Sequence, residues 1–80
     1  MDINIARHVI RASFRGGREL ENLLGLLKEH CDGSEYKTYA AAIAAAIASI
    51  QLEIVDRVVS SHPALGEEVE ATISKYGRYL

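Results

Sequence analysis

The feature that most constrains this chain is an uncharged stretch, residues 38–52, inside a longer helical pattern over residues 34–62. Its apolar side chains recur at alternating spacings of four and three residues, which is the period of one face of an α-helix. Two neighbouring faces carry this pattern. The isoleucine row holds Tyr36, Ala40, Ile43, Ile47, Ile50 and Ile54, and the alanine row holds Ala41, Ala45, Ala48, Leu52, Val55 and Val59. Together they cover an arc of about 200°, so this helix is expected to have neighbours on two sides.

A second helical pattern covers residues 3–31 and also has two apolar rows. The first holds Ile3, Ala6, Ile10, Ser13, Gly17, Leu20, Leu24, Leu27 and Cys31, and the second, called the Ile5 row, holds Ile5, Val9, Ala12, Gly16, Leu23, Leu26 and His30. Glu19 is the one exception in the Ile5 row. The helical phase does not slip at Gly16-Gly17, as it would in an ordinary loop. One continuous helix is therefore predicted, despite a cost of roughly 1 kcal/mol per glycine; two helices hinged at this pair are the alternative.

Only residues 31–33 separate the two patterns. Because the connection is so short, the two helices are expected to be antiparallel neighbours. Folding about this turn should set large side chains of one helix against small ones of the other. The expected partners are Leu20 and Leu24 with Ala41 and Ala45, and Ser13 and Ala6 with Leu52 and Val59. Alanine at Gly17, in the row that faces the second helix, is expected to overpack this contact.

Sequence signals also mark the helix ends. Asp32 followed by Glu35 fits an N-terminal capping box. Pro63, directly after His62, suits the first position of a third helix, and Gly77 suits its end. The predicted fold class is therefore all-α, with a long antiparallel helical hairpin plus a short C-terminal helix. The 80 residues form one domain, which is expected to dimerise into a helical bundle.

The two apolar rows of the long helix lead to a prediction of self-association. The first helix can cover one row, and the short C-terminal helix can cover at most half of the other. The remaining strip would exceed the few hundred Å² that are usual on a monomer. Two hairpins related by a two-fold axis would bury it in a four-helix bundle. The predicted oligomer interface consists of Ile43, Ile47, Ile50 and Ile54, with the neighbouring alanine row as the alternative.

A basic ridge lies along the first helix. It consists of Arg7, Arg11, Arg15 and Arg18. One interpretation is a binding site for an anionic partner, either nucleic acid or a phosphate-bearing ligand. The other is a solvated face whose arginines pair with acidic groups such as Glu53 and Asp56. The formal net charge of −2 and the lack of interleaved aromatic residues beyond Phe14 favour the solvated face over a nucleic-acid site.

The chain shows no pattern typical of an enzyme. It lacks a nucleophile placed beside a base, a glycine loop after a strand, and paired carboxylates in a cleft. The turn gathers metal-binding residue types, namely His30, Cys31, Asp32 and Glu35, but no second cysteine or spaced histidine pair completes a zinc site. No catalytic role and no cofactor are therefore expected.

Composition places the protein in the cytoplasm. One cysteine gives no internal disulfide, and residues 1–10 lack the basic, apolar and cleavable regions of a signal peptide. The uncharged run of 15 residues is short for a membrane span, so none is predicted. The expected function is that of a small helical interaction or scaffold protein, which acts as a homodimer or higher oligomer and binds itself or a further protein.

Overall fold

The computed structural model describes residues 1–79, and these contain helices and short turns but no strand. The helices are α1 (Ile3–His30), α2 (Gly33–Ser49), η1, a π-helical segment (Ile50–Val55), α3 (Asp56–Ser61) and α4 (Pro63–Tyr76). The all-α prediction is confirmed. Of the two alternatives for residues 3–31, the single continuous helix is confirmed, because α1 runs unbroken through both glycines.

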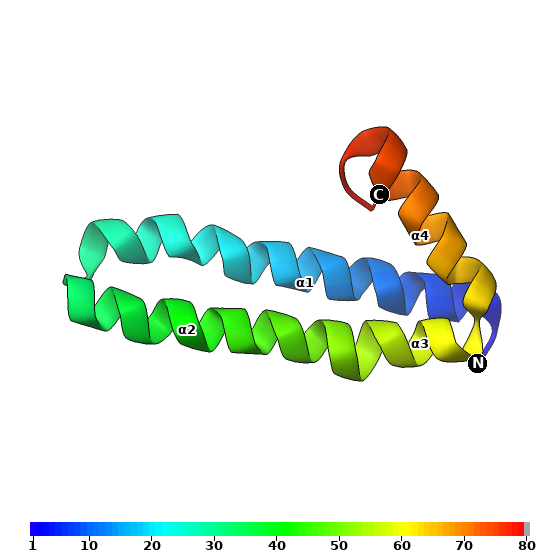
Figure 1. The fold of residues 1–80 in the computed structure, drawn as a ribbon, viewed down its shortest axis with the longest axis horizontal. Coiled ribbons are helices and arrows are strands. Elements are labelled where there is room, and N and C mark those ends of the chain that lie inside the picture. The colour runs from blue at the N-terminus through cyan, green and yellow to red at the C-terminus, as the bar shows by residue number, and fades with distance from the viewer. Residues whose placement is uncertain (80) are drawn as a thin grey trace.

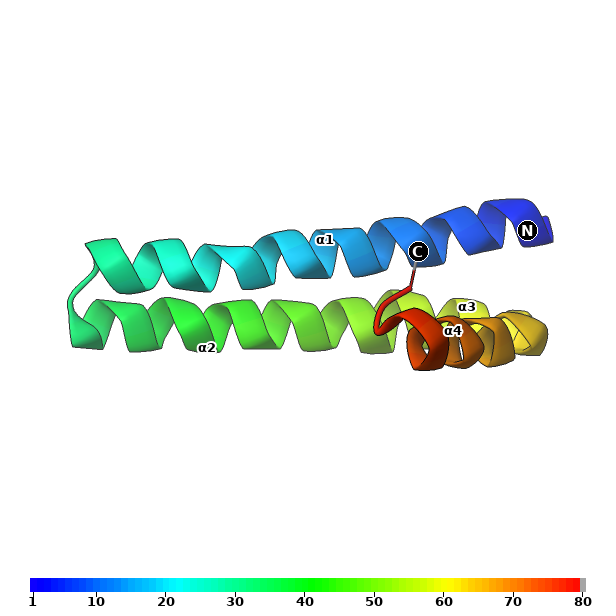
Figure 2. The same cartoon turned by 90° about the horizontal axis from the view of Figure 1, so that it is seen from above.

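The helices form a long two-helix unit with a third helix at one end. α2, η1 and α3 follow one another as a single rod, and α1 lies antiparallel beside it in both views (Figure 1, Figure 2). Asp32 begins the rod, because its side chain accepts a 2.8 Å hydrogen bond from the backbone N–H of Glu35. α4 turns back after His62, with Pro63 at its start, and ends at Gly77, whose φ of 77° is left-handed. No third helix covers the half of the unit that is close to the turn (Figure 1).

The hydrophobic core lies at the end of the molecule where α4 packs. It consists of Ala6, Ile10, Val58, Leu65, Val69 and Tyr79. Tyr79 follows α4 and folds back onto α1, where its ring lies 5.8 Å from that of Phe14, centroid to centroid. Between residues 14 and 54, by contrast, Ile43 is the one buried side chain. The two halves of the same long helices are therefore packed very differently.

The π-helical segment η1 changes which side of the rod faces α1. Before it, the residues on that side are Ile43, Ile47 and Ile50; after it, they are Val55 and Val58. The backbone N–H of Asp56 donates to the carbonyl of Gln51, five residues earlier, so the turn contains one residue more than an α-helical turn. A regular α-helix would continue the isoleucine row towards the charged Arg57. The extra residue allows the buried side to pass from the isoleucine row to Val55 of the alanine row and then to Val58.

The expected contact between α1 and the alanine row is wrong for the half near the turn. Ala41 and Ala45 are exposed, and Leu52 is 65% exposed. Leu24 of α1 instead lies beside Ile43 and Ile47 of α2. Burial stabilises by about 0.8 kcal/mol per CH₂ group, so covering isoleucines contributes more than covering alanines.

The expected role of Gly17 in close packing is also wrong. A methyl group added at Gly16 or Gly17 would meet no atom within 4 Å. The small residues of α1 therefore leave open space on both sides of the helix rather than a tight contact with the rod.

Candidate functional site

The single chain exposes more surface than a compact protein of its size. Its radius of gyration is 14.8 Å and its extents are 45 × 25 × 16 Å, whereas a compact domain of this length has a radius of about 12 Å. Its accessible surface is 5640 Å², against about 4,800 Å² for a folded monomer of this mass. The difference is roughly 850 Å². The same chain has almost no buried side chain in the half of the molecule near the turn.

The structure places most of the predicted interface residues against α1. Ile43 is buried, and Ile47 and Ile50 are half-buried in a pocket that they share with Gly17 of α1. Ile54 alone among the four retains a large exposed area, 40% of its maximum. The phase change at η1 causes this difference, because it brings Val55 against α1 and leaves Ile54 at the edge of the contact. Three of the four isoleucines are therefore already in contact with the chain's own first helix.

An open apolar groove runs between α1 and η1. Its volume is about 390 Å³, and it is lined by His8, Val9, Ala12, Ser13, Gly16, Ile50 and Ile54. No residue of α4 lines it. By helical phase, the α1 residues that line the groove lie on the opposite side of α1 from Arg7. Arg7 contacts α4. The groove is therefore on the face of the two-helix unit opposite α4.

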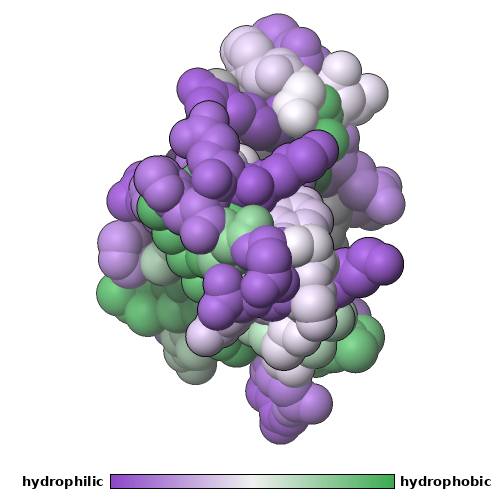
Figure 3. All heavy atoms as spheres, turned by 90° about the vertical axis from the view of Figure 1, so that its left-hand side faces the viewer, coloured by the Kyte–Doolittle hydropathy of each residue, from purple (hydrophilic) through white to green (hydrophobic). Residues whose placement is uncertain are grey.

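Exposed large side chains extend this groove in both directions along α1. The exposed fractions are 55% for Ile5, 42% for Leu23 and 53% for Leu26. On the rod, Tyr39 lies on the same side as Ile50 by helical phase and is 51% exposed. The groove and these flanking residues are called the groove face below. Seen from the turn end, hydrophobic side chains gather on the flanks of the unit, whereas hydrophilic side chains cover its top and bottom (Figure 3).

The groove lining contains few polar side chains that a partner would have to satisfy. Of its lining residues, His8 alone has an ionisable side chain. The hydroxyl of Ser13 donates a 2.8 Å hydrogen bond to the carbonyl of Val9, one turn earlier in α1. Apart from His8, the lining would let apolar side chains of a partner enter without leaving a buried polar group unsatisfied.

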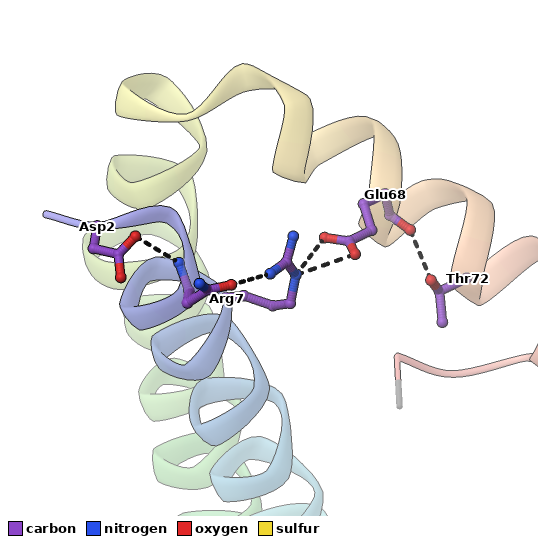
Figure 4. A network of polar contacts seen from close by, with 5 residues as sticks. Asp2, Arg7, Glu68 and Thr72 are labelled. Carbon is purple, nitrogen blue, oxygen red and sulfur yellow. Dashed lines mark hydrogen bonds and ion pairs between the residues drawn. The ribbon is translucent and has the colours of Figure 1, made fainter.

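The basic ridge on α1 is partly used to hold α4. The Nε of Arg7 donates to both carboxylate oxygens of Glu68, at 3.1 and 3.2 Å, and an Nη donates to the side-chain oxygen of Asn4 at 2.9 Å (Figure 4). Sequence reasoning suggested Glu53 and Asp56 as acidic partners. In the structure Glu53 forms an ion pair with Arg57 at 3.1 Å, and a side-chain oxygen of Asp56 accepts a hydrogen bond from Gln51.

The C-terminal tail occupies the next part of the ridge. The guanidinium carbon of Arg11 lies 5.9 Å from the centroid of the Tyr79 ring. Burial raises the pKa of the Tyr79 hydroxyl, and so does the carboxylate of Glu68, whereas Arg11 and Arg7 act in the opposite direction. Arg18 is half-buried and Arg15 is exposed. Arg7 and Arg11 are thus committed to intramolecular contacts, and the ridge serves as a docking strip for α4 and its tail.

The turn between α1 and α2 is a helix boundary without a metal cluster. Among residues 1–79, no three His, Cys, Asp or Glu side chains lie close enough to hold a metal ion. The pKa of the Cys31 thiol is raised, first by a hydrogen bond with the side chain of Glu35 and then by burial and by the carboxylates of Glu35 and Asp32. A raised pKa reduces the fraction of this cysteine that is present as thiolate at neutral pH.

The rod itself is long and apolar enough to cross a membrane by length and composition. The qualifying stretch is Gly33–Ser61, with 29 residues, and 11% of its apolar window is buried within the chain. Core helices of soluble proteins pass the same test when a partner covers them. Within the single chain, most of the apolar window of the rod is exposed.

The Ile5 row was visible in the sequence, but it was not assigned to the interface. The available signal was that α1, like the rod, has two apolar rows, so one row remains when the two helices pack together.

Comparisons of the chain with protein-family models, with curated proteins and with solved structures found no match.

Proposed function

We propose that this protein is a small helical interaction or scaffold module that acts as a homo-oligomer. In this proposal two helical hairpins, each made of α1 and the α2–η1–α3 rod, pack together as a four-helix bundle. The observation that supports it is the sparse core: Ile43 is the one buried side chain between residues 14 and 54. A two-helix segment this long is not expected to persist in water without further cover.

Protein cover is favoured over lipid by the distribution of charge in the rod. Its uncharged part, residues 38–52, is about 22 Å long as a helix, whereas the hydrocarbon core of a bilayer is about 30 Å thick. Lys37 and Glu53 limit this part at its two ends, and Asp56 and Arg57 follow. Their burial in lipid would cost a few kcal/mol each. A cytoplasmic bundle without a cofactor or catalytic role accommodates these charges at its surface.

The mass of the protein in solution tests this proposal. Sedimentation or light scattering over a dilution series should give at least twice the chain mass of 8.8 kDa at micromolar concentration. On further dilution, dissociation should be accompanied by loss of the helical circular dichroism signal. A stable, folded monomer throughout the series would overturn the proposal.

A further inference from the structure

We infer that the groove face is where a second copy of this chain docks, across a two-fold axis that passes beside Gly16. This inference rests on the proposed function and specifies the surface that it uses. It differs from the interface predicted by the sequence, because it places the Ile5 row of α1 at the centre of the contact, together with Ile54, the most exposed of the four predicted isoleucines.

The available area fits a second copy. The single chain exposes roughly 850 Å² more than a compact monomer of its mass. A stable interface of standard size buries about 800 Å² on each partner. One isologous contact would therefore return each chain to the exposure expected of a compact protein, without requiring a larger partner.

The other faces of the molecule are less suited to this contact. On the opposite face, α4 and Tyr79 already cover Phe14 and the neighbouring part of α1. The side of the rod that points away from α1 carries alanines, with Leu52 as its one large exposed aliphatic residue. The groove face carries five large exposed side chains, Ile5, Leu23, Leu26, Tyr39 and Ile54.

The order of side chains along α1 suits an antiparallel pairing about its midpoint. The Ile5 row is large at both ends and small in the middle, where Ala12 and Gly16 lie. Gly16 is close to the centre of Ile3–His30, so a two-fold axis there brings the Ile5 end of one α1 against the Leu23 end of the other. A glycine at the crossing point permits close approach of the two backbones.

The one charged residue of the row fits the same arrangement. Glu19 lies three residues after Gly16, and Arg15 lies one residue before it on the neighbouring rim. In an antiparallel pairing about Gly16, Glu19 comes beside Arg15 of the partner subunit. Opposite charges on the rim favour this orientation over a parallel one, in which the like charges would lie side by side.

Two matched pairs of variants test the inference. Ile54→Glu and Leu52→Glu both place a carboxylate on η1 at an exposed aliphatic position, 40% and 65% exposed respectively. Ile54→Glu should raise the dissociation constant by about a hundredfold or more, because two like charges enter an apolar contact. Leu52→Glu should leave it nearly unchanged. The reverse result would overturn the choice of face.

Cysteine cross-linking gives an answer even if Ile54→Glu fails to fold. In a Cys31→Ser background, Gly16→Cys should form a disulfide-linked dimer on mild oxidation, whereas Gly17→Cys, one residue away, should not. Both positions have room for a side chain in the single chain. Equal cross-linking, or faster cross-linking at Gly17→Cys, would overturn the inference and leave the proposed homo-oligomer standing. A monomeric unmodified protein would overturn both.

Discussion

The two ends of the long helical pair differ in how they are stabilised. At the end near the chain termini, three helices meet and Ala6, Ile10 and Leu65 lose almost all contact with water. At the turn end, two helices lie side by side and each exposes one side to water. The helices themselves are continuous between the two ends, so helical propensity does not explain the difference. A third layer of side chains decides where a core forms, because a pair of helices can bury only the strip along which they touch.

The largest expected effect comes from the core at the α4 end. Leu65→Ala, at a position that is 1% exposed, should lower the free energy of unfolding by about 3 kcal/mol. Leu26→Ala truncates a side chain at the turn end that is 53% exposed, so any loss beyond about 1 kcal/mol must come from a partner subunit. Urea unfolding at several protein concentrations measures both. An equal loss for the two variants, at a midpoint that does not depend on concentration, would contradict the difference between the ends.

The glycine pair sharpens the comparison within α1. Gly17→Ala should increase the free energy of unfolding by up to about 1 kcal/mol, because alanine favours helix and the added methyl group meets no atom. Gly16→Ala should increase the free energy of unfolding by less, or should weaken association of the two chains, because Gly16 lies at the proposed crossing point. Thermal unfolding and sedimentation of both variants provide the check. Identical gains for the two variants would argue against close approach at Gly16.

The tail that completes the core should respond to alkaline pH. Tyr79 is buried, and within residues 1–79 its hydroxyl has no hydrogen-bond partner. Its pKa is raised by burial, so the stability linked to this group is fully present below the pKa of an unfolded tyrosine, about 10. That stability is lost as the pH rises through the higher folded value. Tyr79→Phe should remove this alkaline loss and should change stability near neutral pH by about 1 kcal/mol or less.

Tyr76→Phe is the matched control, because Tyr76 is 56% exposed. Unfolding midpoints at neutral and alkaline pH, compared between each variant and the unmodified chain, isolate the contribution of each hydroxyl. A larger alkaline effect at Tyr76 than at Tyr79 would show that the tail does not stay folded against Phe14.

The smallest expected effect concerns the arginine ridge. Arg7→Gln removes the ion pair with Glu68, whose two side chains are 26% and 39% exposed, and should cost between 0 and about 1 kcal/mol. Arg57→Gln removes the more exposed pair with Glu53 and should cost less. Added salt should reduce the difference in stability between each variant and the unmodified protein. If these single changes instead abolished a salt-sensitive interaction with polyphosphate or nucleic acid, the anion-binding interpretation of the ridge would replace the docking role described here.

Much of the fold follows from patterns that are local in sequence. The preserved phase across Gly16-Gly17 predicted a continuous α1, and Asp32, Pro63 and Gly77 marked helix ends that the structure confirms. The side of the rod that faces α1 was not predicted. The spacing of the side chains that face α1 changes from three and four residues to five between Ile50 and Val55, at the π-helical turn, whereas the isoleucine row in the sequence continues without a break to Ile54.

The candidate surface was predictable only in part. The sequence showed that apolar rows would remain uncovered, and it named the Ile5 row, but it assigned the interface to four isoleucines, of which α1 covers all but Ile54. The roles of Arg7 and Tyr79 in holding α4 and its tail involve partners more than 60 residues apart in the chain. No local pattern identifies such partners.

The sequence by itself determined where helices begin and end, because caps, prolines and glycines act on the hydrogen bonds and dihedral angles of a single turn. It also determined that each long helix has two apolar rows. Only the tertiary structure decided which row is covered. That choice depends on the summed burial between segments distant in sequence, and isoleucine against α1 buries more apolar area than alanine does. The same choice turned Ile54 and the Ile5 row outward, where they form the surface proposed to bind a second copy.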